Sequence, residues 1–299
     1  MRRWGWLLCG LTSLLVLALP ARSFIPQAER VEKATAEANK TSGRAQALQL
    51  ELTLRVAERD PIGTGVLVSH PTGLARLELR DAQGRIERHL LLGTEHSASR
   101  DGTEIESPRA FLPPVFLLQG DSTLALRSAM TSFGLDVEAI GLAPCGKKVC
   151  YIVGDPARVP PPPPLSEEEL EALAKAEMEV AEAGGGLLPA GELRFETAVE
   201  DASAGDSGHP PAIWIETERF EIVRVDSREG VIVELGPVIV FGDVRFPRWL
   251  TVQEPGREVV RLDFLQVVPV NAPAAVFKRS WLLRSPEAAG EAADPTPLH

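Results

Sequence analysis

Apolar and polar residues alternate in several short segments of this chain, and a turn follows nearly every segment. In the clearest segment the apolar residues are Leu48, Leu50, Leu52, Leu54 and Val56. Successive side chains of a β-strand point to opposite faces, so this alternation gives a strand one apolar and one polar face. Strand-like segments recur at residues 76–80, 85–92 and 213–216. A sheet built from them must cover its apolar face with another layer of the protein.

Residues 244–268 predict two strands joined by a tight turn. The apolar face of the second strand consists of Val260, Leu262 and Phe264. Pro255 fixes φ and Gly256 permits a positive φ, which is the order that a tight turn needs. The polar face of this hairpin requires no partner, whereas its apolar face must be covered by a helix or by a ligand.

Few segments predict helices. Residues 26–41 carry a thin apolar stripe at helical spacing, consisting of Ala28, Val31, Ala34 (or Thr35) and Ala38. Residues 166–183 begin with a capping box and are rich in glutamate, which is typical of a solvated face and less often of a docking arm.

The best candidate for the cover over the sheet is the segment 111–133. It opens with a dense apolar run whose double proline cannot lie in an interior strand. Asp121 or Ser122 can then cap a helix that runs to Phe133, and Gly134 can stop it. We expect Leu124, Met130 and Phe133 to form the apolar side of this helix.

Together these segments predict a mainly β (α+β) fold of about ten or eleven strands. Because short turns link nearly all of them, the sheet should be antiparallel and curved, as in an open half-barrel. The helices should pack on its concave face.

The N-terminus has the pattern of a signal peptide at residues 1–23. A short positive region precedes an apolar stretch at 6–19, and small residues precede a cleavage site after Ser23 or after Ala21. That stretch is too short to span a membrane comfortably, and no other segment is long and apolar enough. We therefore expect an exported, soluble mature protein.

The rest of the chain divides by composition. Residues 24–284 predict a single domain, interrupted at 157–209 by an insert with a five-proline run and the acidic helix. Residues 285–299 are rich in Ala, Glu and Pro, and we expect them to be disordered.

Cys145 and Cys150 lie close together in the sequence of the mature chain. A metal site would need further ligands that no nearby Cys or His supplies, and a redox pair has the shorter Cys-x-x-Cys spacing. A disulfide that clasps a hairpin is favoured in an oxidising compartment. It closes a short loop, so its stabilisation should be modest.

Charge and motifs argue against nucleic-acid binding and catalysis. The net charge of −11 comes without a basic patch for phosphates. The sequence has no HExxH, GxSxG or phosphate-cradling glycine loop. His89, Glu95 and His96 are close in sequence, but we interpret them as surface residues rather than as a metal site. We expect no enzyme, no metal and no cofactor.

The order of motifs resembles the LolA/LolB-like periplasmic lipoprotein-carrier superfamily. The matching motifs are Gly65-Val-Leu-Val-Ser-His-Pro71 running into Arg76, the Asp101-Gly102 turn, Pro211-Ala-Ile-Trp-Ile-Glu216 and Val244-Arg-Phe-Pro-Arg248. The resemblance spans about residues 26–280 without the insert. It implies a periplasmic half-barrel with a helical lid and an apolar cavity that shelters acyl chains.

The resemblance also suggests a gating loop. In the classical carrier a basic residue precedes the loop proline and helps to gate the lid. Here His70 stands at that place and Arg76 follows, so these two residues are the gating-loop candidates. A neutral imidazole departs from the family pattern, as does the insert at 157–209.

The predicted function is therefore binding of a hydrophobic or acylated ligand. The candidates that line its cavity are Leu50, Leu52, Leu54, Leu112, Val115, Phe116, Leu117, Met130, Phe133, Trp214, Trp249 and Phe264. Each of them can instead fill a closed core, because protein interiors are normally well packed. The alternative function is an envelope scaffold that binds a protein partner through 157–209.

Overall fold

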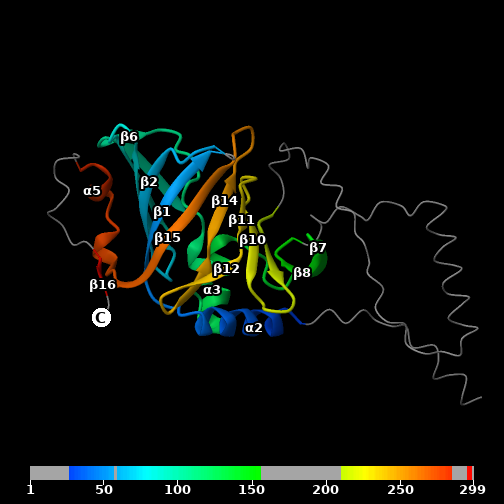
Figure 1. The fold of residues 1–299 in the computed structure, drawn as a ribbon. Coiled ribbons are helices and arrows are strands. Elements are labelled where there is room, and N and C mark those ends of the chain that lie inside the picture. The colour runs from blue at the N-terminus through cyan, green and yellow to red at the C-terminus, as the bar shows by residue number, and fades with distance from the viewer. Residues whose placement is uncertain (1–26, 57–58, 156–209, 285–294, 298–299) are drawn as a thin grey trace, which may run out of the picture.

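The structure, a computed structural model, describes residues 27–56, 59–155, 210–284 and 295–297 (Figure 1). The predicted signal peptide and the predicted acidic helix of the insert lie outside these ranges. Within them, no helix has the length and apolar character needed to cross a membrane.

One large antiparallel sheet forms the body of the protein. In spatial order its strands are β6 (Thr103–Ile105), β5 (Glu95–Arg100), β4 (Ile86–Leu92), β3 (Leu74–Asp81), β2 (Gly63–Ser69), β1 (Leu48–Val56), β15 (Val260–Asn271), β14 (Trp249–Gln253), β11 (Ile232–Leu235), β10 (Ile222–Asp226), β9 (Ala212–Glu216), β8 (Lys148–Val153) and β7 (Ile140–Cys145). The two outermost strands do not pair with each other, so the sheet stays open. The expected curved antiparallel architecture is confirmed.

The described residues contain sixteen strands rather than ten or eleven. The region 231–240 divides into β11 and β12 (Val238–Phe241) because Pro237 has no N–H to donate to a ladder. β12 pairs with β13 (Val244–Pro247) as a separate small sheet, so 244–268 holds three strands and not two. Strand β16 (Thr296–Pro297) pairs with β15 in the tail that was expected to be disordered.

Helices cover the inner face of the sheet, which we define as the face that carries Leu50 and Leu52. They are α2 (Ala28–Thr41), the 3₁₀ turn η1 (Val115–Leu118) and α3 (Thr123–Phe133). Figure 1 shows α3 behind the strands and α2 across their lower ends. Their buried side chains join those of the strands in one core, which confirms the predicted cover.

Local sequence signals explain both ends of α3. The Ser122 hydroxyl accepts a hydrogen bond from the Ala125 N–H at 3.3 Å, which caps the first turn. Gly134 ends the helix at φ 91°, a left-handed conformation that glycine adopts without strain. The expected apolar side was partly wrong, because Leu124 is 81% exposed and the buried residues are Leu126, Ala129 and Met130.

The buried stripe of α2 also differs from the expected one. It consists of Ala28, Val31, Glu32, Thr35, Ala36 and Asn39. One of its polar residues, Asn39, donates hydrogen bonds to the carbonyls of Leu117 and Gly120 at 3.3 and 3.1 Å. The helix thereby holds the end of η1 in place.

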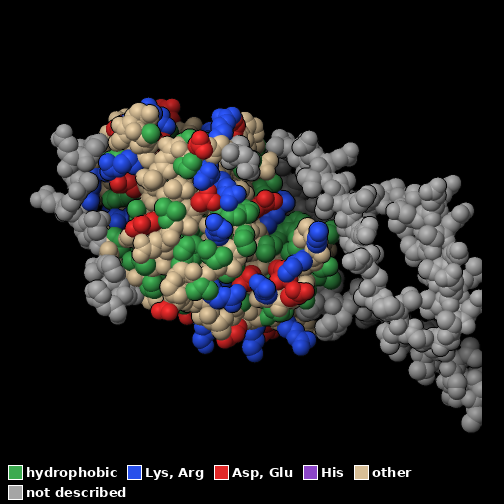
Figure 2. Space-filling view, viewed as in Figure 1, with side chains coloured by type: hydrophobic (Ala, Val, Ile, Leu, Met, Phe, Trp, Pro, Cys, Tyr) green, Lys and Arg blue, Asp and Glu red, His purple; other side chains and the backbone are tan. Residues whose placement is uncertain are grey.

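The outer face of the sheet carries mixed charges among apolar side chains (Figure 2). Arg55 on β1 and Arg261 on β15 each form an ion pair with Asp263 at 2.9 Å. Further along this face the short helix α5 (Arg279–Leu282), preceded by η3 (Ala274–Val276), places Trp281 between Arg76 and Arg88. The sequence patterns did not predict this second, smaller cover.

The hairpin of β7 and β8 contains the predicted disulfide. Cys145 and Cys150 are bonded to each other, with their Cα atoms 5.8 Å apart. Cys145 pairs in register with Lys148, so the turn is only Gly146-Lys147 and the bond links diagonal neighbours.

The hairpin of β14 and β15 lies in the middle of the sheet. Val260, Leu262 and Phe264 are buried on its inner face, as expected. The ring of Phe246 on β13 packs edge-on against Phe264, with 5.2 Å between the ring centres. Protein side chains therefore cover this part of the apolar face.

Candidate functional site

A cavity of about 710 Å³ lies between α3 and the inner face of the sheet. One wall is formed by Leu91, His96 and the turns 71–73 and 93–94. The opposite wall is the β10–β11 hairpin with Val225, Val231 and Val233, and its turn at 227–229. Two distant parts of the sheet thus form opposite walls of the cavity. Residues of α3 and residues 110–116 line the rest of it.

The mouth of the cavity lies along α3. Ala125, Ser128 and Ser132 line it and are exposed to solvent, whereas Ala129 lines it and is buried. The spacing of these residues by three and four places them on one side of the helix. Small side chains on that side leave room that larger ones would fill.

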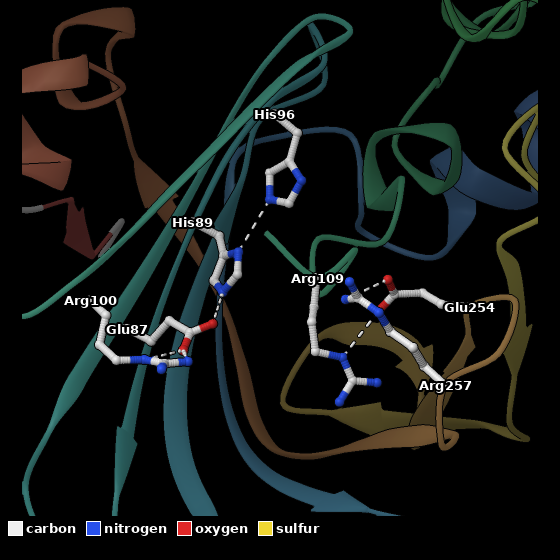
Figure 3. Close-up of polar contacts among 7 residues, drawn as sticks. All are labelled: Glu87, His89, His96, Arg100, Arg109, Glu254 and Arg257. Atoms are coloured by element: carbon white, nitrogen blue, oxygen red, sulfur yellow. Dashed lines mark hydrogen bonds and ion pairs between the residues drawn. The ribbon is translucent and has the colours of Figure 1, made fainter. Parts of the chain in front are cut away.

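Hydrogen bonds hold the chain on both sides of residues 110–116, the segment that lines the cavity. At its start, Arg109 donates to Glu254 at 3.2 Å and to the Glu258 carbonyl at 2.9 Å, and its guanidinium lies 5.0 Å from the centre of the Phe111 ring. Figure 3 shows Arg109 and Arg257 on the same carboxylate of Glu254. At its end, Gln119 donates to the Gln46 carbonyl at 2.8 Å. Residues 110–116 are therefore held at a fixed place over the sheet.

Three of the predicted cavity residues do line the cavity: Leu112, Phe116 and Phe133. The residues that instead lie in the closed core beside it are Leu50, Leu52, Leu54, Val115, Leu117, Met130 and Phe264. For these seven the alternative of plain core packing fits the structure.

The two predicted tryptophans lie on the outer face. Trp214 belongs to a separate cluster with Cys150 and Ile152, and its indole N–H donates to Asp226 at 3.2 Å. Trp249 stacks under the guanidinium of Arg261 at 4.6 Å. Each alternates with inner-face residues of its own strand, so neither can reach the cavity.

The gating-loop candidates have different surroundings. His70 precedes the 71–73 turn that lines the cavity, but its ring packs against Phe277, with 6.1 Å between ring centres. Burial lowers the pKa of His70. Arg76 lies on the outer face, 5.1 Å from the Trp281 ring and 3.4 Å from the Val276 carbonyl. Arg76 is therefore not one of the residues that line the cavity.

Four polar side chains that the sequence patterns did not predict to interact form a row (Figure 3), and the last of them, His96, lines the cavity. Arg100 donates to Glu87 Oε2 at 2.7 and 3.1 Å. Glu87 Oε1 lies 3.0 Å from His89 Nε2, and His89 Nδ1 lies 3.2 Å from His96 Nε2. His89 is fully buried, with the edge of its ring against Phe111 at 5.2 Å. We call these four residues the histidine relay.

Hairpin register explains how the relay forms. The two-residue turn Gly93-Thr94 pairs Leu91 with His96 and Glu87 with Arg100. Glu87 and His89 are two apart on one strand and therefore share a face. Glu95, which was grouped with the histidines, lies 3.9 Å from Arg279 instead. Treating His89 as a surface residue was wrong.

Two residues of the histidine relay, Glu87 and His96, have strongly shifted pKa values. Burial alone would raise the pKa of Glu87, but hydrogen bonds from His89 and Arg100 outweigh it and lower the pKa to about 2. Burial, together with the neighbouring His89, lowers the pKa of His96 to about 4. At neutral pH the cavity wall therefore carries an ionised carboxylate behind a neutral His96.

Other parts of the described structure are weaker candidates for a functional site. Across the described ranges, no group of three or more His, Cys, Asp and Glu side chains is placed to hold a metal ion. A second space of about 400 Å³ lies beside α2 and is lined by Glu37, Arg219, Glu221 and Arg245 among others. Glu221 and Arg245 form an ion pair there at 3.1 Å, so these charges balance each other.

Comparisons with known proteins found similarity among solved structures only. No protein-family model and no curated protein sequence matches the chain. Among solved structures, a LolA superfamily protein from Nitrosomonas europaea is similar with a TM-score of 0.44 and 10% identity. A DUF1329 family protein from Desulfovibrio piger gives 0.41 and 8%, and a domain from Vibrio parahaemolyticus described as a proposed outer membrane lipoprotein-sorting protein gives 0.42 and 8%.

Each similarity covers 86% of this chain and 100% of the other chain. Two of the three names are those of the group that the order of sequence motifs resembles. At TM-scores below 0.5 the likeness carries no functional argument, which must come from the cavity itself.

Proposed function

We propose that this protein is a periplasmic binding or carrier protein that shelters a lipid, a lipoprotein acyl chain or another hydrophobic ligand in the cavity under α3. The observation that supports this function is the cavity itself, about 710 Å³ and lined by Leu91, Leu112, Phe116 and Phe133 among others. Ligand sites in proteins typically enclose about 300–1,000 Å³ and are mostly apolar. Binding of this kind needs no catalytic residue.

The physical driving force is removal of the acyl chain from water. Each buried methylene contributes about 0.8 kcal/mol, which corresponds to a factor of about four in affinity. The cavity walls are fixed by the sheet and by the fastened segment 110–116, so little conformational entropy is lost when a ligand enters. A preformed site of this size can therefore bind an alkyl chain without an ordering step.

The test is a titration with methyl esters of saturated fatty acids of increasing length, followed by displacement of bound anilinonaphthalene sulfonate. We expect affinity to rise by up to about fourfold per methylene until the cavity is full. Affinity that does not depend on chain length would contradict the proposed function.

A matched pair of variants on α3 locates the site. Ala125→Trp places a bulky side chain at the mouth and should weaken binding at least about tenfold, which corresponds to about 1.4 kcal/mol. Leu124→Trp makes a similar change one position earlier, where the side chain is 81% exposed and does not line the cavity. It should change affinity less than about twofold. Equal effects of both variants would place the binding site elsewhere.

The periplasmic location and the scaffold alternative concern residues outside the described ranges, namely 1–23 and 157–209. The apolar cavity favours ligand binding over a scaffold, because a scaffold that lost its ligand has no need of an open interior space. Replacement of 157–209 by a short linker separates the two functions.

A further inference from the structure

The histidine relay meets the cavity at one end. His96 lines the cavity, whereas His89 behind it is fully buried and Arg100 lies at the far end of the row. His96 uses Nε2 for its contact with His89. Figure 3 shows the other ring nitrogen, Nδ1, directed away from His89, and no described residue makes a hydrogen bond with it.

The proton on each ring follows from the ionised carboxylate. Glu87 can only accept, so Nε2 of His89 carries a proton and donates it to Glu87. Arg100 already balances the charge of Glu87, and a second cation on the fully buried His89 would be uncompensated. With Nε2 donating to Glu87 and no second counter-charge beside the ring, Nδ1 of His89 is left to accept.

The hydrogen-bonding role of His89 then determines which nitrogen of His96 carries a proton. Since Nδ1 of His89 accepts, Nε2 of His96 must carry the proton that lies between the two rings. The pKa of His96, lowered to about 4 by burial and by His89, leaves the ring neutral near pH 7. Its remaining nitrogen, Nδ1, has a lone pair and no proton.

From this geometry we propose that Nδ1 of His96 accepts a hydrogen bond from the head group of the bound ligand, and that the ligand is a neutral amphiphile with a hydroxyl donor, such as an alkyl alcohol or a monoacylglycerol. The inference rests on the proposed function and adds the chemical class of the ligand. Glu87 and His89 act as positioning residues, because they set the tautomer of His96 without touching the ligand.

The charges on the opposite wall agree with a neutral head group. Arg228 and Glu229 are adjacent in the turn of the β10–β11 hairpin, and both are exposed. Their charges have opposite sign and are screened by solvent. This wall therefore offers no net charge to hold a carboxylate.

The experiment compares three probes with matched alkyl chains: dodecan-1-ol, its methyl ether and dodecanoate. Displacement of bound anilinonaphthalene sulfonate at pH 7 gives their affinities. The alcohol should bind about five- to tenfold more tightly than the ether, which cannot donate, and more tightly than dodecanoate. Tighter binding of dodecanoate than of the alcohol would overturn the proposal.

His96→Phe tests the contact itself. The ring retains its place against His89 but loses the acceptor, so the alcohol and the ether should bind alike. The readout is the ratio of the two affinities, because any change in the apolar contacts of the shared alkyl chain affects the alcohol and the ether alike. An alcohol preference that persists in this variant would show that His96 is not the acceptor.

Glu87→Gln tests the tautomer. Arg100 should hold the amide oxygen, which turns the amide NH₂ toward His89 Nε2. The protons then shift along the relay, His96 presents an N–H to the cavity, and dodecanoate should become the tightest of the three probes. Adding His96→Phe to Glu87→Gln should remove this gain, because the N–H is then absent.

Glu95→Gln is the control for charge, because it makes the same substitution beside His96 on an exposed residue outside the relay. It should leave the order of the probes unchanged. If all three probes bind with equal affinity in wild type and in every variant, this inference is wrong while the proposed function stands. If none of the probes binds, both fail.

Discussion

Glu32 on α2 is an unusual residue in this protein because its carboxylate is buried without a hydrogen-bond donor. The side chain is fully buried, and no described residue hydrogen-bonds to either oxygen. A cation on α3, Arg127, lies 3.9 Å from the carboxylate. Burial raises the pKa of Glu32, Arg127 opposes this effect, and Glu29 adds to it.

The raised pKa of Glu32 makes the stability of the fold depend on pH. A carboxyl whose pKa is higher in the folded state than in the unfolded state stabilises the fold when it is protonated, and this stabilisation is lost as the pH rises through the folded pKa. We therefore predict that Glu32→Gln raises the free energy of unfolding at pH 7 by about 1 kcal/mol. The gain should shrink as the pH falls toward 4.5, the ordinary pKa of a glutamate.

Urea unfolding at pH 7 and pH 4.5 measures this difference. Glu37→Gln, an exposed position on the same helix, is the control and should change stability by less than about 0.5 kcal/mol. A gain of equal size at both pH values would contradict a buried carboxylate as its cause.

At the scale of the elements, the β7–β8 hairpin lies at the edge of the sheet and contains a disulfide bond. β7 is an edge strand, with a partner on one side only. The bond between Cys145 and Cys150 ties it to β8 across a short loop. In the chain-entropy account, a loop of this length gives about 2 kcal/mol.

We predict that the double substitution Cys145→Ala and Cys150→Ala lowers the free energy of unfolding by about 2 kcal/mol. Wild-type protein kept reduced should show the same urea midpoint as the variant. Ligand affinity should not change, because neither cysteine lines the cavity. Equal midpoints for oxidised and reduced wild type would show that the bond adds no stability.

At the scale of the whole molecule, the sheet is complete without the residues between β8 and β9. Val153 pairs with Ile213, so the two strand ends that the insert connects are neighbours in the sheet. Gly154, at φ 115°, lies so close that an added Cβ would come within 2.3 Å of the Pro211 carbonyl oxygen. A short turn can therefore span the same gap.

We predict that replacing residues 157–209 by Gly-Ser-Gly-Ser leaves a folded domain that keeps its ligand affinity. Loop closure costs about 0.6 kcal/mol per doubling of length, so the shorter loop should stabilise the domain by about 1–2 kcal/mol. Urea unfolding and the ester titration check both points. Loss of a co-purifying protein with ligand affinity intact would support the scaffold alternative, and loss of cooperative unfolding would show that the insert completes the domain.

The sequence by itself determined the local elements. The alternation of Leu48 to Val56 predicts β1, Ser122 and Gly134 set the ends of α3, and the Pro255-Gly256 turn predicts the hairpin of β14 and β15. These signals are short-range: a period of two, a cap or a turn depends on neighbouring residues alone. The same alternation also predicts that Trp249 faces outward, because Leu250 beside it faces inward.

Only the tertiary structure decided which elements meet. β1 pairs with β15 from the far end of the chain, and the cavity is lined by two hairpins that are distant in sequence. The histidine relay depends on strand register and on the burial of His89 beneath Phe111. Periodicity shows which side chains share a face, but the partner of that face is chosen by packing over the whole chain. For this reason the sequence predicted an apolar face that needs a cover, and the fold determined where that cover leaves a space.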